Sequence, residues 1–274
     1  MRLGWTAGQS SARLKWLAII AAVGLTAVYS YIYFVEPFDV FWNNLLSDGL
    51  SVFASLLSAI AATMVWAYYD KTDYPRKFWR YFAIGLWLWF VGESIWAYLN
   101  MTIVEVTVGP HDIFWIISYY FIGRTFLLQY QILRRPTTRA LLGLAVAMLV
   151  LVFVLTLAVS VFLSGSSDTF ETLINAFYPA ADFVLVLSAL WVTSSFQGGA
   201  LGRPWIGLLI FCVSDLMNAW LQYSGIYAWS LDQGNLLSSI SDIIYFAAYL
   251  VLALGAFSQW RFLKYGLRPV AETR

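Results

Sequence analysis

Long apolar stretches alternate with short polar stretches along almost the whole chain. We place the apolar stretches at residues 15–34, 48–69, 79–100, 112–133, 139–162, 175–196, 204–225 and 238–260. Each is close to the length of about 20 residues that an α-helix needs to cross the hydrocarbon of a bilayer. The pattern therefore predicts an all-α integral membrane protein with eight transmembrane helices.

Composition agrees with this interpretation. Hydrophobic residues make up 61% of the chain and charged residues only 11%, whereas soluble domains carry about 25% charged residues. The polar stretches between the apolar ones are too short for a separate domain. We therefore expect residues 1–274 to form a single membrane domain that has the lipid bilayer as its main surroundings.

Lys and Arg gather in every second connection between the apolar stretches, which orients the chain because cytoplasmic loops carry the basic excess. With the N-terminus inside, the cytoplasmic segments hold Arg2, Arg13, Lys15, Lys71, Arg76, Lys77, Arg80, Arg134, Arg135, Arg139, Arg203, Arg261, Lys264, Arg268 and Arg274. The only other basic residue, Arg124, lies inside an apolar stretch. This asymmetry predicts that both termini are cytoplasmic in a multi-pass protein of the inner (plasma) membrane.

Several segments of the first half recur in the second half. "HDIFWIISYYFIG" (111–123) resembles "SDIIYFAAYLVLAL" (241–254), with Asp, Ile and Tyr at matching places. "GESIWAYLN" (92–100) matches "SDLMNAWLQ" (214–222) in the same way. Such duplication is common in membrane proteins built from repeated bundles.

A weaker match joins "SDGLSVFASLL" (47–57) to "ADFVLVLSALW" (181–191). Together the matches predict one repeat over about 15–135 and a second over about 139–262, followed by a short cytoplasmic tail at 263–274. Both halves begin on the same side of the membrane. The repeats are thus expected to be parallel and related by an axis along the membrane normal.

Four acidic residues lie near the expected starts of helices that enter from outside: Asp48, Asp112, Asp182 and Asp242. A carboxylate in the first turn of a helix accepts unpaired backbone N–H groups and meets the positive end of the helix dipole. These residues are therefore either helix caps or part of an outward-facing binding site.

Glu93 and Asp215 lie inside apolar stretches, toward the helix end where the dipole disfavours a carboxylate. An ionisable group at membrane depth indicates a functional site and needs a partner. We expect Glu93 to pair with Arg124, either to fasten two helices or to form a binding site together with Asp215. Aromatic side chains such as Trp96 and Tyr178 would then line this polar cluster.

Several kinds of chemistry lack the residues they require. The four lysines all lie at cytoplasmic ends, which excludes a retinal Schiff base within a late span, and His111 is the only histidine, which excludes a bis-histidine haem. We find no Cys/His metal pattern, phosphate-binding glycine loop or nucleophile motif. We accordingly expect no metal, no cofactor, no nucleic-acid partner and no enzymatic activity.

Residues 36–46, "EPFDVFWNNLL", mix apolar and polar positions between the first two apolar stretches. Such a mixture is typical of a short helix lying in the membrane interface. We expect a separate interfacial helix here, acting either as a lid or as a spacer.

The recurring segments resemble the multi-helix N-terminal membrane region of bacterial diguanylate cyclases and some sensor kinases, over roughly residues 45 to 262. The positions that carry this resemblance are Glu93, Trp96, Pro110, Asp112, Tyr178, Pro179, Asp182, Asp215, Asp242 and Tyr249. The resemblance implies a region that receives a signal and passes it to a cytoplasmic enzyme. Only "RFLKYGLRPVAETR" follows the last apolar stretch, so we expect no output domain and a partner protein instead.

The sequence thus favours a noncatalytic membrane sensor or accessory module with an outward-facing polar pocket. Its expected partners are a protein at the cytoplasmic face or within the membrane, and a small ligand or cation from outside. Two alternatives stay open: a small secondary transporter that uses membrane carboxylates, and a structural subunit of a larger membrane complex.

Overall fold

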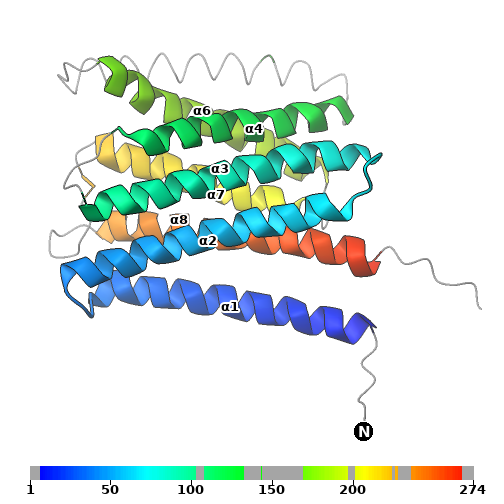
Figure 1. Ribbon diagram of the computed structural model, residues 1–274, viewed down its shortest axis with the longest axis horizontal. Helices are drawn as coiled ribbons and strands as arrows, with labels where there is room; N and C mark the ends of the chain where they lie inside the picture. The colour runs from blue at the N-terminus through cyan, green and yellow to red at the C-terminus, as the bar shows by residue number, and fades with distance from the viewer. Residues whose placement is uncertain are drawn as a thin grey trace, which may run out of the picture.

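The computed structural model describes residues 7–102, 108–132, 143, 169–196, 201–223, 226–227 and 236–266. All regular elements in these ranges are helical, and the long helices lie side by side (Figure 1). They are α1 (Ala7–Val35), α2 (Val40–Tyr68), α3 (Tyr74–Thr102), α4 (Pro110–Ile132), α6 (Thr169–Ser195), α7 (Arg203–Tyr223) and α8 (Leu236–Arg261), followed by the π-helical turn η2 (Phe262–Gly266). The apolar stretch expected at 139–162 lies outside the described residues.

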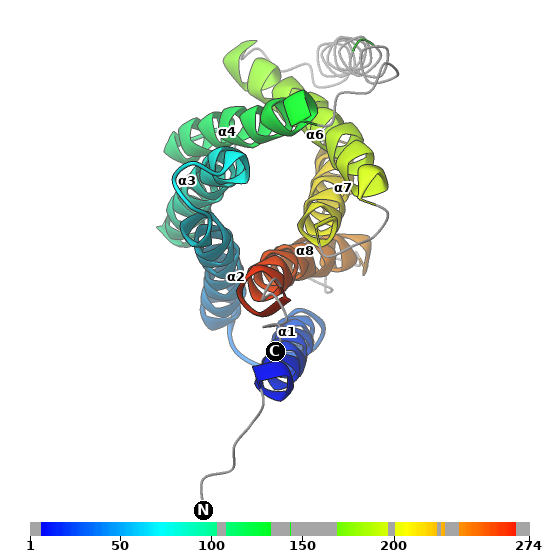
Figure 2. The same ribbon diagram turned by 90° about the vertical axis from the view of Figure 1, so that its right-hand side faces the viewer.

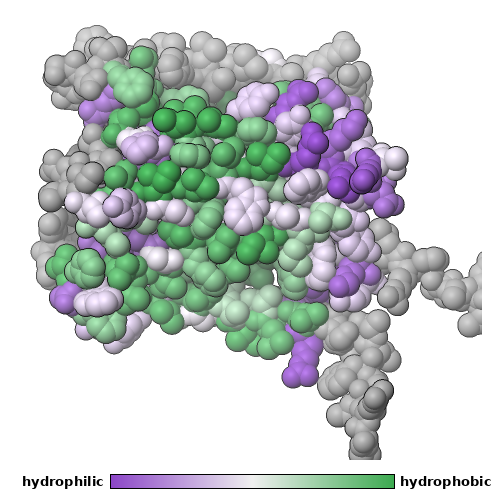
Figure 3. Space-filling model, in the orientation of Figure 1, coloured by the Kyte–Doolittle hydropathy of each residue, from purple (hydrophilic) through white to green (hydrophobic). Residues whose placement is uncertain are grey.

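In this part of the chain, six helices are long and apolar enough to cross a membrane: α1, α2, α3, α6, α7 and α8. They do not include α4, whose apolar stretch is interrupted by Ser118, Arg124 and Gln129. The visible surface is mainly apolar over the middle of the helices, and hydrophilic residues gather toward their ends (Figure 3). The all-α, multi-pass membrane character expected from the sequence is confirmed at this level.

Six of the helices form a ring. Each of α2, α3, α4, α6 and α7 packs against the next helix in this series, and α8 packs against both α7 and α2 to close the ring. The view along the helices shows this ring clearly, and α1 lies outside it against α2 and α8 (Figure 2). Side chains in the middle of the ring are therefore shared between the two halves of the chain.

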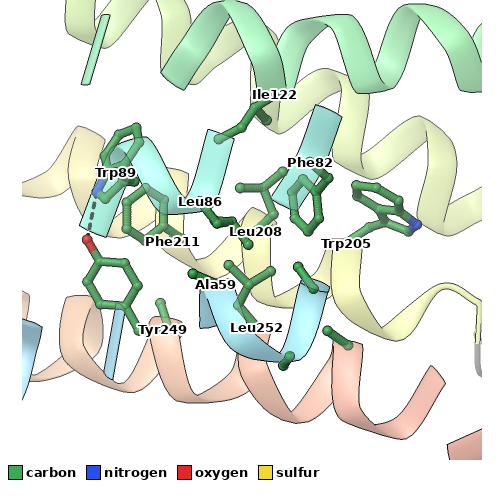
Figure 4. Packing of buried hydrophobic residues seen from close by; sticks show 14 of the residues in the cluster. Ala59, Phe82, Leu86, Trp89, Ile122, Trp205, Leu208, Phe211, Tyr249 and Leu252 are labelled. Carbon is green, nitrogen blue, oxygen red and sulfur yellow. Dashed lines mark hydrogen bonds between the residues drawn. The ribbon is translucent and has the colours of Figure 1, made fainter. Parts of the chain in front are cut away.

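Large apolar side chains pack inside the ring (Figure 4). The fully buried residues of this cluster include Phe82, Ile122, Trp205, Leu208 and Leu252. Trp205 lies against Phe82, with ring centroids 5.1 Å apart. Because lipid tails are as apolar as these side chains, close packing contributes more than removal from water to holding such helices together.

Glycines permit several of the close contacts between helices, as two examples show. A Cβ atom on Gly207 of α7 would lie 2.4 Å from Cα of Leu252 in α8. A Cβ on Gly85 of α3 would lie 2.8 Å from Cγ1 of Ile122 in α4. Small residues at membrane helix interfaces let backbones approach and gain dispersion contacts along their length.

The prediction of a separate interfacial helix at 36–46 is wrong. Asp39 is the N-cap of α2, its carboxylate accepts the backbone N–H of Trp42 at 3.0 Å, and α2 continues without a break from Val40 to Tyr68. The mixed pattern arises because the first turns of α2 have one face toward the protein, where Asn43 and Ser47 are buried, and one face exposed. Asn43 Nδ2 also donates to the carbonyl of Phe38 at 2.8 Å, which fixes the turn before the helix.

Gly207→Ala tests the close contact of α7 with α8. The added methyl group would meet backbone atoms of Leu252, so we expect the free energy of unfolding to fall by about 1–3 kcal/mol, as in other overpacked interiors. Gly49→Ala is the matched control, because its Cβ would meet nothing within 4 Å. Thermal unfolding in detergent measures both, and equal midpoints for the two variants would contradict the close contact.

Candidate functional site

Glu93 lies in α3 toward one end of the apolar cluster and is only 4% exposed. Its Oε1 accepts three hydrogen bonds: from the indole of Trp89 at 3.2 Å, from Tyr245 at 3.1 Å and from Tyr249 at 2.9 Å. Trp89 also donates to the Tyr249 oxygen at 2.7 Å (Figure 4). The carboxylate is therefore held between α3 and α8 by neutral donors.

The prediction of an ion pair between Glu93 and Arg124 is wrong. Glu93 faces α8, as its bonds to Tyr245 and Tyr249 show. Arg124 is half-buried on α4 and makes no ion pair with any described residue. Proximity along the chain gave the wrong partner because the ring brings α8, from the far end of the chain, next to the acid-bearing face of α3.

Asp182 of α6 and Asp215 of α7 lie on either side of one hydroxyl group. Tyr119 of α4 is 2.6 Å from Asp182 Oδ1 and 3.2 Å from Asp215 Oδ2. The two carboxyl groups are also within hydrogen-bonding reach of each other. Asp182 is 1% exposed, whereas Asp215 is half-buried.

This arrangement requires a shared hydrogen. A carboxylate ion only accepts hydrogen bonds, so two carboxyl groups bond to one another only when one carries a proton. The Tyr119 hydroxyl supplies a single hydrogen and therefore satisfies one acceptor at a time. Within the described residues no Lys or Arg pairs with either acid.

A third acid lies nearby at the start of α4. Asp112 accepts the Tyr178 hydroxyl on Oδ1 and the backbone N–H of Gly109 on Oδ2 at 2.7 Å. His111 Nε2 is 3.3 Å from the same Oδ2. The ring of Tyr178 lies 6.0 Å from that of Tyr119, so this acid adjoins the Asp182–Asp215 pair through two tyrosines.

Asp242 and Asp48 form a separate polar group beside α1. Asp242 accepts from Asn218 and from the hydroxyl of Tyr227, both at 3.0 Å. Asp48 accepts from Asn100 at 2.9 Å. Burial raises the pKa of Tyr227, which lies in the connection between α7 and α8, so its hydroxyl stays protonated and donates to Asp242.

The cap interpretation is confirmed for only one of the four outer acids. Asp112 lies in the first turn of α4 and accepts a backbone N–H. Asp48, Asp182 and Asp242 are not caps, because α2, α6 and α8 begin at Val40, Thr169 and Leu236, well before these acids. The helices start earlier than the apolar pattern indicates, since their first turns carry polar residues.

The structure brings the polar residues expected from the sequence into two groups. The first contains Glu93, Asp112, Tyr178, Asp182 and Asp215, and the second contains Asp48 and Asp242. Trp96 is half-buried on α3 and takes part in none of these bonds. One cavity lies between α1 and α8, and another lies in the ring beside Trp79 and Trp205. Neither Glu93 nor Asp215 lines either of them.

Sequence reasoning missed Trp89, Asn100, Asn218 and Tyr227 as partners of the acids. The available signal was indirect: Asn100 and Asn218 lie in the recurring segments, close to the acids that the alignment matched. Among the described residues no three His, Cys, Asp or Glu side chains converge as a metal site requires. What the arrangement does offer is a network of acids and tyrosine hydroxyls, with the buried thiol of Cys212 beside Asp182.

Comparison with known proteins returns no match: no protein-family model, no curated protein and no solved structure is similar to this chain. The resemblance to the membrane region of diguanylate cyclases therefore stays a prediction.

Tyr119→Phe tests whether the hydroxyl between Asp182 and Asp215 holds the pair in place. Removing it leaves one buried acceptor without a donor, so we expect the free energy of unfolding to fall by about 1–3 kcal/mol. Tyr120→Phe is the control, because Tyr120 is its neighbour on α4 but 66% exposed. Thermal unfolding in lipid nanodiscs measures both variants, and a loss in Tyr120→Phe as large as that in Tyr119→Phe would refute the bridging role.

Proposed function

We propose that this chain is a noncatalytic membrane module, a sensor or accessory subunit, in which the buried acid–tyrosine network responds to protons or small cations from the outer side. The observation that carries this proposal is the Tyr119 hydroxyl between the buried carboxyl groups of Asp182 and Asp215. Intramembrane ionisable groups mark ion or proton sites by default. No group of three or more His, Cys, Asp or Glu side chains that could hold a metal ion occurs in the described part of the chain.

The network links helices in a way that makes it a switch. Tyr119 connects α4 to α6 and α7, while Glu93 connects α3 to α8 through Tyr245 and Tyr249. Gain or loss of a proton at one acid changes the number of donors it needs, which alters contacts across the ring. A signal can shift a conformational equilibrium only through such differential contacts.

We further propose that the ring consists of two parallel repeats, and paired contacts support this. The alignment that matches Glu93 with Asp215 also matches Gly85 with Gly207. The alignment that matches Asp112 with Asp242 likewise matches Ile122 with Leu252. The contact of Gly85 in α3 with Ile122 in α4 is thus repeated between α7 and α8 as the contact of Gly207 with Leu252.

The polar network follows the same relation. Tyr119 and Tyr249 occupy matching positions of α4 and α8. Tyr119 lies 3.2 Å from Asp215 of α7, and Tyr249 lies 2.9 Å from Glu93 of α3. Duplication of one tyrosine–acid contact explains why acids occur twice at membrane depth, and it supports a common role for both.

In this proposal the chain crosses the membrane eight times, with both termini and the basic connections in the cytoplasm. The basic excess in alternate connections supports this orientation. The acids then lie toward the outer side, and the ends of α3 and α8 near Lys77 and Lys264 face the cytoplasm. A partner protein at that basic face would read the helix shift, as in the signalling proteins that the sequence resembles.

A secondary transporter is the second candidate, and the ring itself favours it. Parallel repeats around a central axis and carboxyl groups within the membrane are features of many transporters. Here the apolar cluster of Phe82, Leu208 and Leu252 closes the middle of the ring. In a transporter this cluster would have to open in each cycle, whereas a sensor needs only a shift.

A pH step distinguishes these functions. With the protein oriented in liposomes, we expect acidification of the outer side to change hydrogen exchange of the peptide covering 258–266 at the cytoplasmic end several-fold. The double variant Asp182→Asn/Asp215→Asn should abolish the change, because an amide side chain neither gains nor loses a proton in such a pH step. Asp70→Asn, in the exposed connection between α2 and α3, should leave it intact.

Uptake of protons or sodium ions can be measured in the same liposomes. Absence of proton or sodium uptake together with the exchange response supports the sensor. Gradient-driven uptake that depends on Asp182 and Asp215 would replace the sensor by the transporter. An unchanged exchange pattern without flux would reject both functions for this network.

A further inference from the structure

A cavity lies inside the ring at the end opposite the acids. Its volume is about 210 Å³. The lining residues come from α2, α3, α4, α7 and α8 and from the connection between α6 and α7: Tyr69, Pro75, Phe78, Trp79, Gln129, Ile132, Phe196, Leu201, Trp205 and Gln259. The apolar cluster of Phe82, Leu208 and Leu252 lies between Trp205, which lines the cavity, and Trp89, which donates to Glu93 (Figure 4).

Polar groups in this cavity lack partners within the described residues. Gln129 is 2% exposed, and neither its amide nitrogen nor its amide oxygen has a hydrogen bond. The indole nitrogen of Trp79 and Oε1 of Gln259 are also buried without partners. Buried polar groups are nearly always satisfied in native proteins, so the concentration of unsatisfied atoms around one cavity points to something that binds there.

The lining defines the chemistry of an occupant. None of the described residues that line the cavity is charged, so an ion would lose its hydration without gaining a counter-charge from them. Trp79, Trp205 and Phe78 offer aromatic faces, which favour a flat, apolar body. The Gln129 side chain presents a donor and an acceptor together, which matches a ligand edge that carries both.

The size sets a further limit. Pockets for drug-sized ligands measure roughly 300–1,000 Å³, and this cavity is smaller. A single aromatic ring with one polar substituent is therefore the appropriate scale.

We propose that this cavity is a binding site for a small, uncharged, flat molecule with a hydrogen-bond donor and acceptor on one edge, the chemistry of an aromatic carboxamide. Gln129 forms the paired hydrogen bonds, Trp79 donates from its indole, and Gln259 accepts. Tyr69 positions Gln259, whose Nε2 donates to the Tyr69 oxygen at 3.3 Å. This site is separate from the acid network and does not depend on the function proposed for it.

Gln129 and Gln259 also correspond to one another. The alignment that matches Asp112 with Asp242 places these glutamines at the same position of α4 and α8. Each half of the chain thus contributes one glutamine to the cavity inside the ring, and a bound molecule would contact both halves at once.

Benzamide in ligand-observed NMR, with the full chain in nanodiscs, tests the proposal. We expect saturable binding of benzamide, with benzoate and toluene binding at least tenfold more weakly because one is charged and the other lacks the polar edge. Gln129→Leu should weaken benzamide binding at least tenfold. Gln131→Leu, an exposed position on the same helix, should leave it unchanged.

Stability separates a binding role from a structural one. In the absence of benzamide, Gln129→Leu should unfold at the same temperature as the unaltered protein or higher, because it removes an unsatisfied buried amide. Trp79→Phe, which removes the indole N–H but keeps an aromatic ring, should weaken benzamide binding in the same way.

Three results would overturn the proposal. These are no saturable binding of benzamide, equal binding to the Gln129→Leu variant, or a lower unfolding temperature for Gln129→Leu. The last result would show that ordered water satisfies the glutamine as part of the fold.

Discussion

The cost of burying carboxyl groups without a basic partner constrains this structure more than any other interaction. Removing an isolated carboxylate from water is prohibitive, and a buried acid must be neutralised or fully hydrogen-bonded. Here the solution uses tyrosine hydroxyls, an indole and a shared proton: Tyr249 and Trp89 hold Glu93, and Tyr119 bridges Asp182 and Asp215. Because Tyr249 and Tyr119 donate to acids on other helices, these hydrogen bonds link α8 to α3 and α4 to α6 and α7.

The rest of the architecture serves that requirement. Gly85 and Gly207 allow α3 to approach α4 and α7 to approach α8, and the tyrosines of α4 and α8 reach acids on α6, α7 and α3. The apolar cluster fills the ring between the acids and the glutamine-lined cavity. The molecule therefore has two polar regions of different character, one that contains carboxyl groups and one that contains neutral glutamines, on either side of a packed apolar centre.

Hydrophobic patterning was sufficient for the fold class, and the helices it placed agree with the structure within the described residues apart from their starts. It missed those starts because polar residues lie among the apolar ones near the beginnings of the helices, such as Asn43 and Asn44 of α2 and Glu171 of α6. The sequence singled out the acids that the structure places in the two polar groups, since carboxylates in or beside apolar stretches are conspicuous. A functional role for these acids stays a prediction. Their partners were not identified: Glu93 was assigned to Arg124 on the next helix, whereas its donors come from α8. Only the ring closure between α2 and α8 determines that pairing, and no local pattern encodes it.

The most direct test of the central claim is infrared spectroscopy of the protein in lipid at neutral pH, comparing the carbonyl stretch of protonated carboxyl groups in the unaltered chain and in Asp182→Asn with Asp215→Asn. If the two acids share a proton beside Tyr119, the unaltered protein shows a band for a protonated carboxyl group that the double variant lacks. Asp70→Asn leaves that band unchanged. Absence of the band in the unaltered protein, or its persistence in the double variant, would contradict the shared proton and with it the role of the network as a proton-responsive switch.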